Sequence, residues 1–572
     1  MTTLTRRAAL GALGASAAAC AKPAVTSPFD AVGAQAGGAF AHGVASGDPD
    51  HRSVVLWSRL TTPTPDPVAV TWEVAETETF SRLSASGEMV AAPENDFTLK
   101  AVAAGLKPGR RYFYRFRAGD SVSPIGRTRT APEGRLEAAR FAVVSCSNYP
   151  FGYFNVYDRI AREEEIDAVL HLGDYIYEYG TDSYGGEAGK ALGRNHEPAT
   201  EILTLADYRR RHAQYKADPG AQAMHAAHPL IAIWDDHETA NNSWKDGAQN
   251  HDPQTEGSWD QRRRAALQAY YEWMPVRDPA PGRSREALFR AWNWGDLLTL
   301  VSLETRLMAR AAQVEYSDIV PTLTSPEAVR KFRDETLWGD DRDMLGDVQL
   351  EHIAKAMGRS AERGEPWRLI ANQIIMAKVT APNLAPHVTE DDIIALEKEW
   401  DQARAFIQFS TLGLPTNLDA WDGYPAARER LYRALREAKA EGVIVVTGDT
   451  HTWWANDLKA RDGSHVGVEL GVHSVTSPSP YRKSFLGGKG AEYALLTSQE
   501  NKDVRYLSGE DHGYIDLTLT REAATARFIA VDTIEAPAYN AFEKAAFTIR
   551  KSNGAAQFVD VNGLSIEERA LF

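Results

Sequence analysis

Short apolar runs that end in glycine or in a charged residue recur along the chain beyond residue 135. They lie at residues 140–145, 167–172, 230–234 and 443–447 and are rich in Val, Ile and Leu. Runs of this length and composition are typical of strands buried on both faces of a largely parallel sheet. Between and after them, the pattern predicts helices at 153–165, 205–216 and 261–274. The alternation of strands with helices predicts an α/β architecture.

Further strands are predicted in the second half of the chain, where the helices are spaced less regularly. These strands lie at 297–304, 368–376, 466–470, 514–520 and 526–531. Because an eight-repeat barrel requires a regular succession of strands and helices, the irregular spacing favours two packed mixed sheets flanked by helices. We find no internal repeat in the sequence.

The segment from residue 40 to residue 130 follows a different pattern, with short alternating runs separated by Pro and Gly. Its strands are predicted at 53–58, 68–74, 98–102 and 111–117. This spacing predicts a small all-β sandwich, and residues 106–115 resemble a strand pair of a fibronectin type III or immunoglobulin-like domain. We therefore expect a non-catalytic β-domain at 38–132 and a catalytic domain at 133–572.

The first 37 residues have the features of an export signal followed by a linker. Arg6 and Arg7 precede the Ala-rich stretch 8–19, which ends at Cys20, and residues 21–37 are rich in Ala, Gly, Pro and Ser. A basic start and a small apolar core predict export, and the paired arginines predict the twin-arginine export machinery as the partner. The alternative is a capped Ala-rich helix. Cys20 is a candidate lipidation site, with ordinary cleavage nearby as the alternative, so the mature protein is expected in the periplasm, outside the cell or anchored to a membrane as a lipoprotein.

Composition narrows the class of substrate. The chain has 572 residues, a formal net charge of -15 and 43% hydrophobic residues, which is typical of a soluble globular protein. A negative net charge argues against nucleic acid as a partner, because phosphate backbones are bound by basic surfaces. An anionic substrate would therefore need local positive charge, most simply from bound metal ions.

Acidic residues follow three of the predicted strands at the point where each strand ends. Asp174 lies in HLGDYIY, Asp235 and Asp236 lie in IAIWDDHE, and Asp449 lies in VIVVTGDTH. The carboxyl ends of neighbouring parallel strands form one ligand-binding edge. Several unpaired buried carboxylates would repel one another, and a hard cation removes that cost. The sequence thus predicts a metal site at this edge.

The neighbours of these residues narrow the choice of metal. Tyr177 lies three residues after Asp174 and can meet the same ion, and a phenolate with a carboxylate suits ferric iron. The alternative is that Tyr175, Tyr177 and Tyr179 are aromatic packing. Cys146 ends the first strand of the α/β region. We interpret it as a thiolate ligand, the alternative being a small buried hydrophobe.

Two further groups of polar residues end strands. Asp235, Asp236, His237 and Glu238 are consistent with a ligand plus a general acid, or with a solvated capping turn. Asp449 and His451 are two ligands at an extended spacing. Arg306 ends another strand and is a candidate for phosphate contacts, with a surface ion pair to Glu304 as the alternative. We interpret lone histidines, such as His171, His225 and His228, as structural or surface residues.

Four ordered blocks of the chain resemble the PhoD-like alkaline phosphatase and phosphodiesterase family, itself similar to purple acid phosphatases. The blocks are Cys146-Ser147-Asn148, Gly173 to Tyr177, Trp234 to Glu238 and Gly448 to Trp454, supported by 343–346, 371–373 and 474–478. The resemblance implies a four-layer αββα metallophosphoesterase core that binds Fe³⁺ and Ca²⁺.

The resemblance also assigns roles to individual residues. It implies iron ligands at Cys146, Asp174, Tyr177 and His451, and calcium ligands at Asp174, Asp236 and Asp449, with Asp235 either a ligand or a residue behind the ligands. Apart from the resemblance, His237 is a candidate for protonating the leaving group or steadying the attacked phosphate, and Asn148 and Arg306 are candidates for phosphate contacts. Purple acid phosphatases have Asn where this chain has Asp236, and Asp where it has Cys146. These departures favour the hard calcium ion over a zinc-type second site.

The expected function is therefore that of an exported metal-dependent phosphatase or phosphodiesterase acting on a phosphate mono- or diester. One alternative is a phospholipase D-type lipid phosphodiesterase. Another, from a different class, is a calcium-binding surface lipoprotein that serves adhesion. Cys146 discriminates against the last alternative, because calcium sites avoid thiolate.

Overall fold

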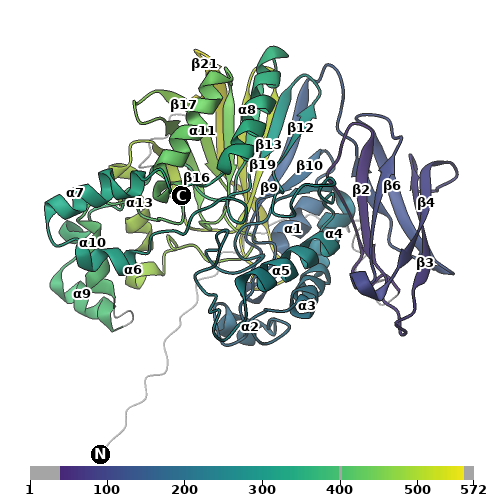
Figure 1. Cartoon of the computed structure of the whole chain (residues 1–572), viewed down its shortest axis with the longest axis horizontal. Coiled ribbons are helices and arrows are strands. Elements are labelled where there is room, and N and C mark those ends of the chain that lie inside the picture. The colour runs from purple at the N-terminus through teal and green to yellow at the C-terminus, as the bar shows by residue number, and fades with distance from the viewer. Residues whose placement is uncertain (1–38, 399–401, 560–572) are drawn as a thin grey trace, which may run out of the picture.

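A computed structural model describes residues 39–398 and 402–559, of which residues 485 and 486 are described by their backbone alone. The predicted export signal, the linker and Cys20 lie outside these residues. The described chain forms three sheets flanked by helices (Figure 1). Within the described ranges, no helix is both long enough and apolar enough to cross a membrane.

The larger core sheet has ten strands and is parallel at its centre. The parallel strands are β9 (Ala138–Val144), β10 (Ala168–His171), β11 (Pro229–Ala232) and β1 (Val44–Gly47). Antiparallel strands extend it on both sides, namely β19 (Gly513–Thr520), β20 (Ala524–Val531), β21 (Ala541–Ser552) and β22 (Ala555–Val559) beyond β9, and β2 (Ser53–Arg59) and β5 (Thr98–Ala104) beyond β1.

The second core sheet has seven strands and packs face to face on the first. Its strands, in spatial order, are β12 (Arg290–Trp294), β13 (Leu298–Ser302), β14 (Trp367–Ala371), β15 (Val443–Thr447), β17 (His465–Gly471), β16 (Trp453–Lys459) and β18 (Val504–Ser508). Side chains from both sheets meet between them. Phe141 contacts Trp294 with ring centroids 5.2 Å apart, and Trp453 stacks on Phe528 at 4.8 Å.

Strand β15 of the second sheet is apolar on both faces, because it is covered on both sides. In β15, Ile444 and Val446 belong to the core between the sheets, whereas Val443 and Val445 pack against the outer helices. Because successive side chains point to opposite faces, a strand covered on both sides must be apolar at every position. This explains the continuous apolar runs in the sequence.

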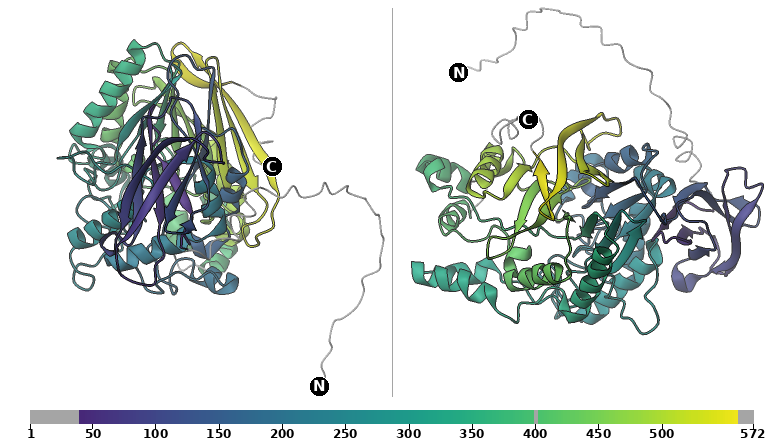
Figure 2. Two further views of the ribbon diagram at one scale, coloured as in Figure 1. Left: turned by 90° about the vertical axis from the view of Figure 1, so that its right-hand side faces the viewer. Right: turned by 90° about the horizontal axis from the view of Figure 1, so that it is seen from above.

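Helices cover the outer face of each core sheet and complete the predicted four-layer αββα arrangement (Figures 1 and 2). The first set is α1 (Asn155–Ala161), α3 (Leu205–Lys216), α4 (Pro219–Ala227) and α5 (Trp259–Trp273), with the short α2 (Gly186–Leu192) nearby. The second set is α8 (Gly346–Glu362) and α11 (Pro425–Glu437). A further group lies at the end of the molecule opposite the N-terminal domain: α6 (Tyr316–Ile319), α7 (Pro326–Asp334), α9 (Glu390–Glu397), α10 (Ala403–Ser410), α12 (Phe485–Gly488) and α13 (Gly490–Glu500).

The predicted N-terminal β-sandwich is present, and it shares one sheet with the catalytic core. Its outer sheet contains β3 (Val68–Ala75), β4 (Leu83–Ala91), β6 (Arg111–Ala118), β7 (Ser121–Val122) and β8 (Gly126–Arg129). Its inner sheet is β1, β2 and β5, and β1 pairs in parallel with β11 of the core. The two domains are therefore joined by backbone hydrogen bonds as well as by the chain.

Some strands and one helix differ from those predicted from the sequence. The strand predicted at 368–376 ends at Ala371, because the Gln373 amide turns away and donates to the carbonyls of Trp234 and Leu303 at 3.0 and 2.8 Å. Strand β16 carries buried polar residues that break the apolar pattern. One of them, Asn456, donates to the Glu469 carboxylate at 2.9 Å. The helix predicted at 153–165 spans only Asn155–Ala161, which is α1.

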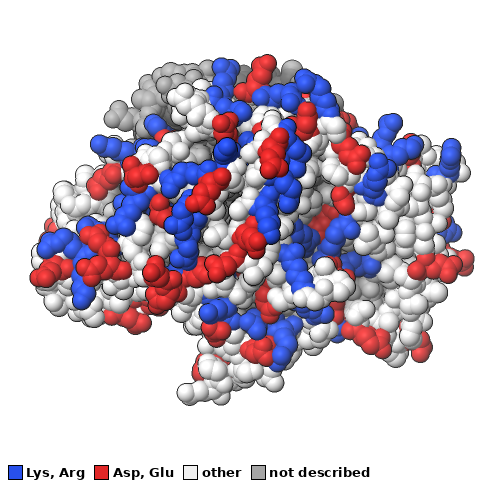
Figure 3. All heavy atoms as spheres, turned by 45° about the horizontal axis from the view of Figure 1, so that its top comes forward, with Lys and Arg blue, Asp and Glu red and all other residues white. Residues whose placement is uncertain are grey.

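The charged surface shows no concentration of one sign on the face seen in Figure 3, where basic and acidic side chains are interspersed. An anionic substrate approaching this face would meet no extended basic area.

The histidines interpreted as structural or surface residues are all buried, with His171, His225 and His228 exposing 2% or less. Burial lowers the pKa of His228 to about 3. Since an unfolded histidine titrates near pH 6.5, the unfolded chain takes up a proton from that pH downward while the folded chain does not. The stability that this residue contributes is therefore complete above pH 6.5 and falls as the pH is lowered.

We expect His228→Gln to reduce the loss of stability in mild acid. The His228 Nε2–H donates to the Ile160 carbonyl at 3.1 Å, a bond that a glutamine amide can also make. Between pH 8 and pH 5 the wild-type protein should lose about 2 kcal/mol more of its unfolding free energy than the variant. Urea denaturation at the two pH values measures this difference, and an equal loss in both proteins would contradict the assignment.

Candidate metal centre

The predicted ligands come together where the carboxyl ends of β9, β10, β11 and β15 meet. Cys146 follows β9, Asp174 follows β10, Asp235 and Asp236 follow β11, and Asp449 follows β15. Except for Asp449, which exposes 17% of its side chain, these residues are almost wholly buried. The expectation that strand ends would bring these side chains to one place is confirmed.

The backbone at this edge is strained in a way that points to a function. Cys146, Asp174, Asp449 and His451 all have positive φ, at 61°, 54°, 62° and 51°. Non-glycine residues rarely adopt this conformation, and such strain gathers at functional sites. Gly173 is needed for the same assembly, because a Cβ there would lie 2.5 Å from the backbone nitrogen of Asp235. Any side chain at position 173 would therefore push apart the loops after β10 and β11.

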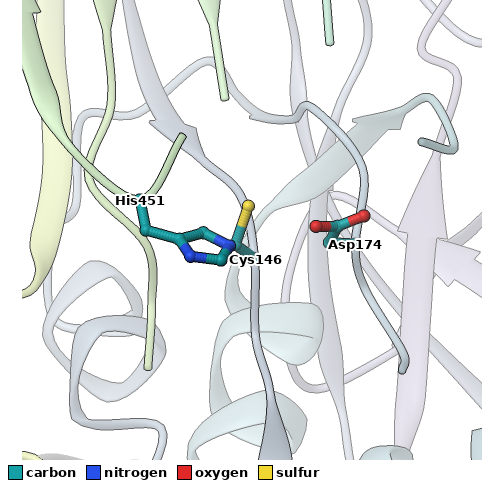
Figure 4. Close-up of side chains that lie close together, drawn as sticks. All are labelled: Cys146, Asp174 and His451. Atoms are coloured by element: carbon teal, nitrogen blue, oxygen red, sulfur yellow. The ribbon is translucent and has the colours of Figure 1, made fainter. Parts of the chain in front are cut away.

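The first cluster of ligand atoms is made by Cys146, Asp174 and His451, which lie within 4.8 Å of one another. Figure 4 shows the imidazole and the carboxylate approaching the cysteine from different loops. The hydroxyl of Tyr177 joins them, donating to Asp174 Oδ2 at 3.0 Å and lying 3.3 Å from His451 Nε2. Aromatic packing alone does not describe Tyr177. Tyr175 packs against other rings, and its hydroxyl lies 2.9 Å from His225 Nε2.

His451 is held in the form that a metal ligand needs. Its Nδ1 lies 3.1 Å from the Pro478 carbonyl, which can only accept a hydrogen bond, so Nδ1 carries the proton. The lone pair is then on Nε2, the nitrogen facing Tyr177. Burial lowers the pKa of His451 to about 3, which keeps the imidazole neutral. A carbonyl partner of this kind commonly fixes the tautomer of a ligating histidine.

A second cluster contains oxygen ligands alone. Asp235, Asp236 and Asp449 have carboxylate oxygens within 4.8 Å of one another, and a third group with the same spacing joins Asp174, Asp236 and His237. Because Asp174 and Asp236 each belong to two of the three groups, the clusters are adjacent and share ligands. The arrangement has the form of a two-metal site.

The residues present fit bound cations. Asp174 Oδ1, Asp235 Oδ2 and Asp236 Oδ1 are buried and have no hydrogen-bond partner among the described residues. Burial and neighbouring carboxylates raise the pKa of Asp174 and of Asp449 well above the ordinary value. Buried carboxylates without partners are costly. Positive charge supplied at the two clusters would keep these side chains ionised.

Arg306 is the guanidinium closest to the second cluster, and it is completely buried. Its Nε donates to Asp235, its Nη1 lies 2.7 Å from Asp419, and its Nη2 lies 3.5 Å from both Asp236 and Asp449. The surface ion pair with Glu304 is therefore wrong. The Glu304 carboxylate instead accepts the backbone N–H groups of residues 306–308.

His237 lies beside both clusters with one ring nitrogen occupied. Its Nδ1 lies 2.7 Å from Glu178 Oε2, and its ring packs on that of Tyr177 with centroids 4.3 Å apart. The imidazole lines the cavity next to the clusters. Nε2 is thus the nitrogen left for a substrate or a metal. The solvated capping turn considered for residues 235–238 is wrong, because all four side chains are buried.

Glu238 has a role that the sequence pattern did not reveal. Its carboxylate accepts the backbone N–H groups of Asp174, Tyr175 and Asp235 at 3.0, 2.6 and 2.8 Å. One side chain therefore ties together the two loops that carry most of the carboxylates. Since each oxygen is committed to backbone amides, Glu238 positions ligands and does not act as the general acid.

Three other residues of the site were missed. Glu178 holds His237, and Asp419 holds Arg306. Ser477 donates to the Tyr177 hydroxyl at 2.8 Å. For Glu178 the sequence offered one signal, its place directly after Tyr177. Asn148 was predicted, and its side chain is buried without a described partner but does not line the cavity, so its contact with phosphate stays a prediction.

Comparison with known proteins identifies the family to which the chain belongs. A family model described as PhoD-like phosphatase matches residues 141–528, and the model of its N-terminal domain matches residues 26–132. Alkaline phosphatase D of Bacillus subtilis (strain 168) is 34% identical over 536 residues, which cover 90% of this chain and 81% of the relative. A solved structure titled "Structure of PhoD" matches with a TM-score of 0.74 and 30% identity, covering 92% of this chain and 94% of that one. The resemblance found in the four sequence blocks is confirmed, and the chain belongs to the PhoD-like phosphatase family of phosphoric ester hydrolases.

Proposed function

We propose that this phosphatase is an exported enzyme that uses iron and calcium to hydrolyse phosphate mono- and diesters. The observation that carries the proposal is the pair of adjacent clusters with different ligand types. Thiol, phenol and imidazole groups join a carboxylate in one cluster, whereas the other contains carboxylates alone. Both border a single cavity of about 370 Å³.

The ligand types support one metal for each cluster. Cys146, Asp174, Tyr177 and His451 would hold ferric iron, since phenolate and thiolate stabilise a trivalent ion. Asp174, Asp236 and Asp449 would hold calcium, which binds oxygen ligands and not sulfur. Bound there, the two ions would acidify a water molecule and neutralise charge on the phosphoryl oxygens.

The chain's own groups would supply the remaining chemistry. His237 Nε2 can hold a proton for the leaving oxygen, because Nδ1 is occupied by Glu178 and the ring cannot turn freely between Tyr177 and Tyr179. Asp235, a member of the oxygen cluster, is held by Arg306. Arg306 itself does not line the cavity, so we assign it to the positioning of carboxylates and not to phosphate contact.

Protein purified with its metals should hydrolyse p-nitrophenyl phosphate and bis(p-nitrophenyl) phosphate and should be coloured. Ferric iron bound by a phenolate and a thiolate gives charge-transfer absorption in the visible range. Cys146→Ser should shift or bleach this band and lower both activities. A spectrophotometric comparison of the two proteins measures this, and a colourless wild-type protein with full activity would contradict the iron assignment.

We also propose export by the twin-arginine route, which carries folded proteins and so suits an iron site loaded before the chain crosses the membrane. The proposal rests on the sequence of residues 5–20, which the structure does not describe. Changing Arg6 and Arg7 to Lys should leave folded, active enzyme in the cytoplasm. Cell fractionation with an activity assay tests this, and undiminished export of the double variant would exclude the route.

A further inference from the structure

Arg306 has a carboxylate partner outside the oxygen cluster formed by Asp235, Asp236 and Asp449. Its Nη1 donates to Asp419 Oδ1 at 2.7 Å, and Asp419 belongs to none of the groups of candidate metal ligands. The guanidinium is fully buried, and the Asp419 side chain is 7% exposed. Asp419 therefore competes with the oxygen cluster for the guanidinium that borders it.

The Arg306 guanidinium stops just short of two candidate calcium ligands. Its Nη2 lies 3.5 Å from Asp236 Oδ1 and 3.5 Å from Asp449 Oδ1. Arg306 Nη2 and Asp236 Oδ1 are both buried, and neither has a hydrogen-bond partner among the described residues. A charge-assisted hydrogen bond between them would be about 2.7–2.9 Å long, so a shift of less than about 1 Å would form it. The two groups stay apart because each side chain is held from another direction.

Asp419 is well placed to hold Arg306 back, because Asp419 is itself fixed from two sides. Arg310 Nη2 donates to Asp419 Oδ1 at 2.6 Å and to the Asp419 carbonyl at 2.8 Å. The Asp419 backbone N–H donates to Asn417 Oδ1 at 2.8 Å. Arg310 is fully buried and lies 4.5 Å from the centroid of the Tyr424 ring. The Asp419 carboxylate therefore draws the Arg306 guanidinium toward itself and does not follow it toward the cluster.

We propose that Asp419 is a positioning residue that holds Arg306 away from Asp236 and Asp449 and so leaves their oxygens free to bind calcium. This inference rests on the calcium site of the proposed function and adds a residue that controls its affinity. Arg306 and Arg310 donate to the same oxygen of Asp419. Without that charge the two guanidinium groups would repel each other, and Arg306 would move toward the carboxylates of the cluster. Arg306 would then pair with the oxygens that the cation needs.

Calcium titration of Asp419→Asn tests the proposal, because asparagine keeps the size of the side chain and removes its charge. Protein purified with its iron is freed of calcium by a calcium-selective chelator and titrated with Ca²⁺ by isothermal titration calorimetry. We expect the Kd for calcium to rise about 10- to 100-fold, the usual range for losing a residue that supports metal ligands. A wild-type Kd in the folded variant would overturn the inference and leave the proposed function standing. Absence of calcium binding by the wild-type protein would overturn both.

A double variant separates the position of Arg306 from the simple loss of a negative charge. In an Arg306→Met background, Asp419 has no Arg306 guanidinium to hold. Adding Asp419→Asn should then leave the Kd for calcium close to that of Arg306→Met alone. If the Kd rose as much as it does in the wild-type background, the Asp419 charge would act directly on the cation, and the proposal would be wrong.

Asp516→Asn is the matched control. Asp516 is 2% exposed and, like Asp419, pairs with two arginines, Arg140 at 2.7 Å and Arg527 at 3.3 Å. It belongs to none of the ligand groups and does not line the cavity. This variant should keep the wild-type Kd for calcium. An equal rise of the Kd in Asp516→Asn would show that loss of any such buried pair weakens calcium binding, which would overturn the inference.

A milder variant serves if Asp419→Asn does not fold. Asn417→Ala, at a half-buried position, removes the acceptor of the Asp419 backbone N–H and loosens Asp419 without removing its charge. The Kd for calcium should rise in the same direction by a smaller factor. A Kd equal to that of the wild-type protein would contradict the role given to Asp419.

Discussion

Replacing His237 with Ala should lower kcat by about 10²- to 10⁴-fold, the usual range for losing an acid–base group. The structure gives the reason, since Nδ1 is bound to Glu178 at 2.7 Å and Nε2 is left to protonate the leaving oxygen. The alkoxide that leaves from an alkyl phosphate is a stronger base than p-nitrophenolate and needs this proton more. The loss should therefore be larger for an alkyl phosphate ester than for p-nitrophenyl phosphate.

The same experiment separates the roles that His237 can have. An equal loss on both substrates would indicate that the imidazole binds the phosphate. Loss of metal together with the imidazole would make His237 a ligand, in line with its place near Asp174 and Asp236. His387→Ala, at an imidazole with a side chain that is 39% exposed, is the control and should leave kcat unchanged. Steady-state kinetics and metal content of the purified variants give these results.

Replacing Arg306 with Met should destabilise the protein by about 3–5 kcal/mol, the range for removing one partner from a buried ion pair. The guanidinium lies between Asp235 and Asp419 and within 3.5 Å of Asp236 and Asp449, so its removal leaves several buried carboxylates facing one another. Binding of calcium at the oxygen cluster should change as well, because the carboxylates lose the group that holds them apart.

Chemical denaturation and calcium titration of Arg306→Met measure both effects. The matched control is Arg404→Met, which breaks two partly exposed ion pairs, one with Glu390 and one with Glu397. Exposed pairs contribute about 0–1 kcal/mol, so this variant should remain close to wild type. If the two variants were equally stable, Arg306 would not hold the carboxylates in the way we describe.

The sequence predicted the fold well wherever strands are apolar on both faces. The strand at 443–447 and the helix at 205–216 have the same bounds in the structure as in the prediction. Strands with polar or exposed positions were missed. Strand β4 alternates between half-buried and exposed side chains along most of its length, and β16 carries Asn456 and Asp457. Polar residues interrupt the apolar pattern in both strands, so the pattern does not predict them. Pairing with neighbouring strands through backbone hydrogen bonds keeps them in their sheets.

The candidate site could be predicted only in part, because its ligands follow recognisable apolar runs in the sequence and its supporting residues do not. Asp174 and Asp449 follow apolar runs and are conspicuous. Glu238 adjoins the predicted ligands, but its partners are backbone amides up to 64 residues away, which no side-chain pattern reveals. Asp419 lies 113 residues beyond Arg306 and follows no strand. Such residues are recognised only when the fold brings them to the site.

The proposed function requires iron and calcium side by side at one site. Mass-spectrometric analysis of metals in protein purified without added metal or affinity tag, together with its visible spectrum, tests this most directly. We predict iron and calcium in the same preparation, a charge-transfer band, and loss of the iron and the band in Cys146→Ser. A colourless, fully active protein that contains zinc and neither iron nor calcium would contradict it.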